Sequence, residues 1–120
     1  GIISTGFMTE RALDAAQFMA KKGISVAVLH VPTIKPFDAG AVLEFAEGVE
    51  RIVTAENHVV VGGLASLVVE TLFDEGISKK VSRIGLPDRY IECGAVPMLQ
   101  ARYGLTTETI VARIMAPKWD

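Results

Sequence analysis

The chain has 120 residues, 50% of them hydrophobic, and its 12 basic and 14 acidic side chains give a net charge of −2. This length indicates one folded domain over residues 1–120, and the small acidic charge argues against a general nucleic-acid partner, which needs a basic surface. The single cysteine, Cys93, excludes an internal disulfide and a multi-cysteine metal cluster. No apolar run approaches the roughly 20 residues of a membrane span, so we expect a cytoplasmic protein with no membrane partner.

Apolar segments rich in β-branched residues alternate with helical patterns, which predicts an α/β fold with a largely parallel sheet. A strand at Ile2-Ile3 precedes a helix over about 7–22. Ile24–Val31 is apolar on both faces, as expected of a strand that helices cover on both sides. Asp38 is a suitable N-cap for a short helix over Ala39–Glu47.

The second half of the chain continues the alternation of strands and helices. The expected elements are, in order, a strand at Arg51–Glu56, a helix from Gly62-Gly63 to Glu75, a strand at Lys80–Ile84, and short helices over about 95–103 and 107–115. The segment 85–94 carries glycine, proline and aspartate and is expected to be irregular.

Three side chains are candidates for an independent catalytic site. A serine nucleophile needs the sharp turn of a G-x-S-x-G motif, whereas Ser66 is expected inside a helix. Cys93 could act beside a histidine, but no motif fixes that geometry, and an incidental loop cysteine explains it better. His30 lies in an apolar strand and is expected to be a hydrogen-bonded core residue. We therefore predict no catalytic, cofactor-binding or metal-binding residue.

Polar groups near the carboxyl ends of the strands are the remaining candidates. Helix N-termini at the turns Thr5-Gly6 and Gly62-Gly63 could hold anions, although neither turn has a nucleotide-binding pattern. Glu56 ends a buried strand, where open α/β sheets place functional groups. It could bind a ligand, cap the following helix or pair with an arginine. The candidate ligand or interface residues are Glu56, His58, Gly62, Gly63, Asp88 and Glu92.

Several segments, taken in order, resemble one family. They are Thr5-Gly6, Pro32-Thr33-Ile34-Lys35-Pro36-Phe37-Asp38, Val53-Thr54-Ala55-Glu56-Asn57-His58, Gly62 to Glu70, and Gly85-Leu86-Pro87-Asp88-Arg89-Tyr90 followed by Glu92-Cys93-Gly94. They resemble the C-terminal domain of the transketolase family of thiamine-diphosphate-dependent enzymes. Close relatives are 1-deoxyxylulose-5-phosphate synthases and the beta subunits of 2-oxoacid dehydrogenases. Thr33 to Pro36 is more similar to transketolase, and Gly85 to Asp88 to the deoxyxylulose-phosphate synthases.

The resemblance implies a three-layer α/β/α domain on a five-stranded, mostly parallel mixed sheet. In such enzymes thiamine diphosphate and magnesium lie between two other domains, and a Gly-Asp-Gly motif, absent here, holds the metal. The resemblance implies that this domain binds no cofactor itself. It would complete a homodimer and support the other domains or an N-terminal subunit.

The leading hypothesis is thus a non-catalytic domain that serves assembly, with regulation as a second role, within a transketolase that transfers two-carbon ketol units between sugar phosphates. The chain would be a fragment or the C-terminal part of a split subunit, with a truncated first strand. The same domain of a deoxyxylulose-phosphate synthase or a 2-oxoacid dehydrogenase beta subunit is one alternative. A small-ligand or regulatory binding module is another, and a hydrolase around Ser66 or Cys93 is the third.

Overall fold

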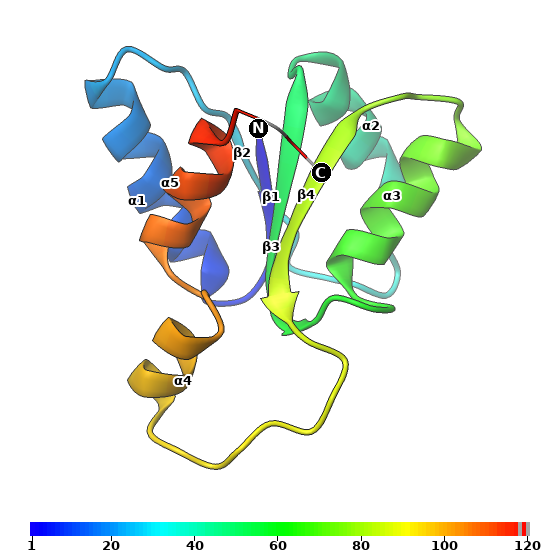
Figure 1. Cartoon of the computed structure of the whole chain (residues 1–120). Coiled ribbons are helices and arrows are strands. Elements are labelled where there is room, and N and C mark those ends of the chain that lie inside the picture. Colours follow the sequence, from blue (N-terminus) through cyan, green and yellow to red (C-terminus); the bar gives the residue numbers. More distant parts are fainter. Residues whose placement is uncertain (118, 120) are drawn as a thin grey trace.

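A computed structural model describes residues 1–117 and 119, in which strands and helices alternate along the chain (Figure 1). The strands are β1 (Ile2–Ser4), β2 (Val28–His30), β3 (Arg51–Val59) and β4 (Lys80–Leu86). The helices are α1 (Met8–Lys21), α2 (Ala39–Glu47), α3 (Leu64–Asp74), α4 (Val96–Arg102) and α5 (Thr107–Met115). The predicted α/β alternation is confirmed. Within the described ranges, no helix is long and apolar enough to cross a membrane.

The strands pair in the order β2-β1-β3-β4, and every pair is parallel. Ile2 of β1 lies between Val28 of β2 and Val53 of β3. The chain therefore moves outward from β1 to β2 and then crosses to the other side of β1 to begin β3. This reversal puts a switch point between the carboxyl ends of β1 and β3, where open α/β sheets usually bind ligands.

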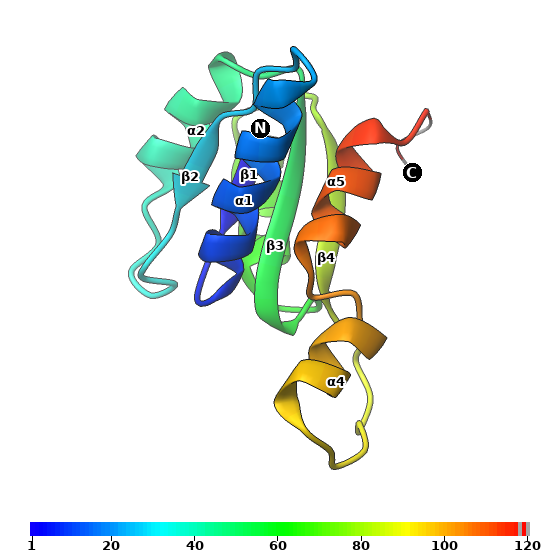
Figure 2. The same ribbon diagram turned by 90° about the vertical axis from the view of Figure 1, so that its left-hand side faces the viewer.

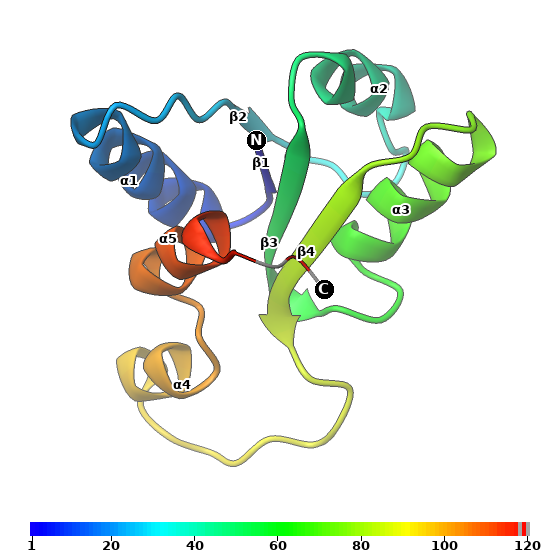
Figure 3. The ribbon, with the colours of Figure 1, turned by 45° about the horizontal axis from the view of Figure 1, so that its top comes forward.

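Helices cover both faces of the sheet: α1 and α5 lie on one face, and α2 and α3 on the other (Figures 1 and 3). Because side chains alternate along a strand, neighbouring residues face opposite layers. Ile2 and Val53 pack with Met8 of α1 and Ile110 of α5, whereas Ile3 packs with residues of α2 and α3. The three-layer α/β/α architecture is confirmed.

The expectation of a five-stranded mixed sheet is wrong for the described residues, which form four parallel strands. After β4 the chain leaves the sheet and runs through an irregular segment into α4 and α5. Helix α5 returns to pack on α1 and β3, so it covers a face of the sheet instead of extending an edge.

The edge strand β2 is shorter than the sequence predicts. Ile24–Val31 was expected to form a strand buried on both faces, but only Val28–His30 is paired. Its only neighbour, β1, has three residues, and a strand pairs no further than its neighbour extends. At this edge Leu29 is half-buried and His30 is exposed, and β4 at the other edge exposes Lys80 and Arg83.

The segment 87–103, called the arm below, lies outside the three layers, beyond the carboxyl end of β4 (Figures 1 and 2). It consists of an irregular stretch over 87–95, α4 and Tyr103. Helix α4 has no buried residue. The arm therefore contributes little to the core and presents most of its surface outward.

Replacing Ile110 by alanine tests the packing of α5 on the sheet. The side chain is fully buried, so Ile110→Ala should lower the free energy of unfolding by about 2–5 kcal/mol through lost burial and the cavity left behind. Urea denaturation measures this loss. The matched control is Leu13→Ala on the half-exposed side of α1, which should cost less than about 1 kcal/mol. Equal losses in the two variants would contradict the packing described.

Candidate functional site

The carboxylate of Glu56 lies at the end of the buried part of β3 and is 1% exposed. Its Oε2 accepts a hydrogen bond from the backbone N–H of Leu64 at 2.8 Å, and its Oε1 accepts one from Ala65 at 3.0 Å. The first N–H groups of a helix lack partners within the helix, and its N-terminus is positively polarised. Of the roles that the sequence left open for Glu56, the structure shows the cap of α3. Those two N–H groups are therefore not free to hold an external anion.

A bulge in β3 and two glycines make room for Glu56. The pairing of β3 with β4 shifts between Ala55 and Val59, which places Glu56 in an irregular stretch of the strand. A Cβ on the buried Gly63 would collide with Glu56 Oε2 and lie 2.7 Å from the carbonyl oxygen of Val59. A Cβ on Gly85 would lie 3.0 Å from Glu56 Cγ. Both glycines are thus required for the buried carboxylate to reach α3.

The hydroxyl of Ser66 stabilises the turn that leads into α3. Its Oγ accepts a hydrogen bond from the N–H of Gly62 at 2.9 Å and donates to the carbonyl of Val60 at 3.3 Å. Gly62 has φ +74°, which a residue with a side chain rarely adopts. Ser66 lies inside α3, as predicted, and its two bonds explain it as a structural residue.

The exposed side chains of Asn57 and His58 lie at the carboxyl end of β3, beside the switch point between β1 and β3. Gly6 has φ +59°, and a Cβ there would collide with the amide oxygen of Asn57. Asn57 therefore lies directly against the turn that begins α1. His58 is exposed, and its Nδ1 lies 3.1 Å from the carbonyl oxygen of Val59.

A hydrogen-bonded chain of three side chains lies beside this switch point. Ser4 Oγ is 3.0 Å from Thr9 Oγ1, which is 2.7 Å from Nδ1 of His30. His30 was expected in the core; it is hydrogen-bonded but exposed, because β2 is an edge strand. Sequence reasoning missed Ser4 and Thr9, although a polar residue ending an apolar strand was a usable signal. The bonds link β1, β2 and α1 at the carboxyl edge.

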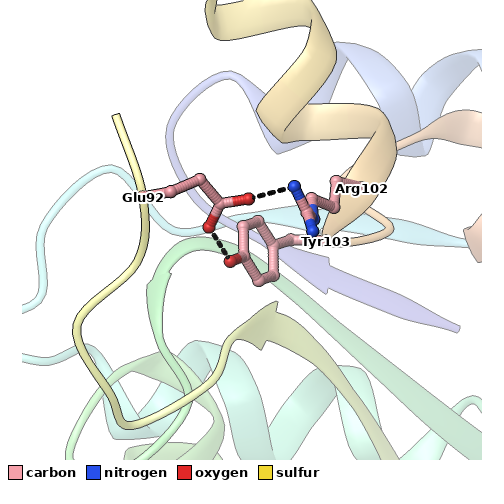
Figure 4. A network of polar contacts seen from close by, with 3 residues as sticks. All are labelled: Glu92, Arg102 and Tyr103. Carbon is pink, nitrogen blue, oxygen red and sulfur yellow. Dashed lines mark hydrogen bonds and ion pairs between the residues drawn. The ribbon is translucent and has the colours of Figure 1, made fainter. Parts of the chain in front are cut away.

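Glu92 belongs to a separate network in the arm. Its carboxylate accepts a hydrogen bond from the hydroxyl of Tyr103, and its other oxygen lies 2.6 Å from Nη1 of Arg102 (Figure 4). The bond from Tyr103, followed by the backbone N–H of Glu92 and the charges of Arg102 and Arg89, lowers the pKa of Glu92. The same bond raises the pKa of Tyr103.

The structure does not gather the six candidate residues into one site. Glu56, Gly62 and Gly63 meet at the start of α3, whereas Asp88 and Glu92 belong to the exposed arm. Among the described residues, no hydrogen bond or ion pair joins Glu56 to His58, Asp88 or Glu92. In the same part of the chain, no group of three or more His, Cys, Asp or Glu side chains could hold a metal ion.

Comparison with known proteins identifies the family. Residues 1–110 match the family model described as transketolase, C-terminal domain, and the chain belongs to this family. It is 50% identical over 115 residues to the transketolase family protein y4mN of Sinorhizobium fredii, covering 94% of this chain and 33% of that protein. It is 43% identical over 107 residues to 1-deoxy-D-xylulose-5-phosphate synthase of Methylacidiphilum infernorum, covering 89% of this chain and 17% of that enzyme.

Solved structures agree with the family match. A split-gene transketolase, an inactive beta4 tetramer, has a TM-score of 0.82 and 37% identity, covering 92% of this chain and 35% of that one. The transketolase of Campylobacter jejuni, with a TM-score of 0.66 and 16% identity, shows the same fold. The chain thus spans about a third or less of the length of these relatives.

Removing the carboxylate of Glu56 should weaken the whole domain. Glu56→Ala leaves two buried N–H groups without a partner and should cost about 2–4 kcal/mol of unfolding free energy, measured by urea denaturation. Glu56→Gln keeps one acceptor and should cost less. The control, Glu70→Ala on the exposed side of α3, should change stability by no more than about 0.5 kcal/mol. A loss in Glu56→Ala no larger than in the control would contradict the capping role.

The bonds among Glu92, Arg102 and Tyr103 predict that the stability of the arm falls at both low and high pH. Because the pKa of Tyr103 is raised in the folded chain, its hydrogen bond stabilises the arm fully below the ordinary tyrosine pKa of about 10. This stabilisation is lost as the pH rises through the pKa of Tyr103 in the folded chain. Because the pKa of Glu92 is lowered in the folded chain, its ionised carboxylate stabilises the arm fully above the ordinary glutamate pKa. This stabilisation is lost as the pH falls through the pKa of Glu92 in the folded chain.

Absorbance titration in a Tyr90→Phe background isolates Tyr103, because the chain has 2 tyrosines. We expect Glu92→Gln to lower the pH at which Tyr103 ionises, since the carboxylate no longer holds the proton. An unchanged titration curve would show that the two side chains are not bonded in solution.

Proposed function

We propose that this chain is a non-catalytic C-terminal domain of a transketolase-like enzyme and that it serves assembly. The observation that carries the proposal is that the buried carboxylate of Glu56 is bonded within the fold. It is the only ionisable side chain buried in the described part of the chain, and both its oxygens bind α3. Asn57 lies against Gly6 at the same edge of the sheet, which is a second contact within the fold.

The reaction of the whole enzyme would be carried by other domains. There, thiamine diphosphate would supply the carbanion-stabilising chemistry that two-carbon ketol transfer between sugar phosphates needs. This domain would bind neither the cofactor nor magnesium. The 50% identity to a transketolase family protein and the likeness to a split-gene transketolase support ketol transfer as the reaction of the whole enzyme. A deoxyxylulose-phosphate synthase remains the alternative enzyme, supported by the relatives of that name.

The partners of the domain would be the thiamine-binding domains or an N-terminal subunit, together with a second copy of the chain in a homodimer. The relatives are about three times as long as their match to this chain, or longer, which supports the presence of such partners. We propose the cytoplasm as the location. The small-ligand alternative has less support, because the N–H groups of Leu64 and Ala65 are already bonded to Glu56.

Calorimetric titration of the chain alone with thiamine diphosphate and magnesium tests the proposal. We expect no saturable binding, because no described cluster of acidic side chains could hold the metal. Mixed with the thiamine-binding polypeptide of its own enzyme, the chain should form a complex in sedimentation and restore ketol transfer. Magnesium-dependent binding of the cofactor by the isolated chain would refute the proposal.

A further inference from the structure

We draw no further inference here: the strongest candidate, the apolar groove between α3 and β4 that is lined by Val69, Leu72, Phe73 and Val81, carries no proposal because nothing in the described part of the chain shows what covers it.

Discussion

The buried carboxylate of Glu56 is the constraint on which the arrangement of β3, α3 and β4 depends. A charge removed from water is tolerated only where hydrogen bonds replace its hydration. Helix α3 must therefore start within reach of Glu56, and the chain must bring Leu64 and Ala65 back to the end of β3. Gly63 and Gly85 follow from the same requirement, because a side chain at either position would enter the space of the carboxylate or its neighbours.

The carboxyl edge of the sheet and the arm differ in how their side chains are held. At the edge, Asn57 covers Gly6, and the chain from Ser4 through Thr9 to His30 joins two strands to α1. In the arm, by contrast, large apolar side chains remain uncovered. This contrast agrees with the proposed assembly role, in which other domains carry the chemistry.

Local patterns were sufficient to predict the helices, and long-range contacts explain what they missed. The spacing of Leu64, Val68 and Leu72 predicted α3 because one helix face is buried. The length of β2 and the exposure of His30 depend on pairing with the three residues of β1, which no local pattern records. Glu56 was found as a candidate, but its partners, eight and nine residues away, were decided by the turn between them. The network of Glu92 required the fold of the whole arm.

The short β2 and the charged β4 protect the domain against aggregation through its sheet edges. Open edges of a sheet offer unpaired backbone groups to other molecules and invite aggregation. Here one edge offers only Val28–His30 and is followed at once by Val31 and Pro32, and the other exposes Lys80 and Arg83. Neither edge is a good template for another strand, so the domain is protected from sheet extension at both edges.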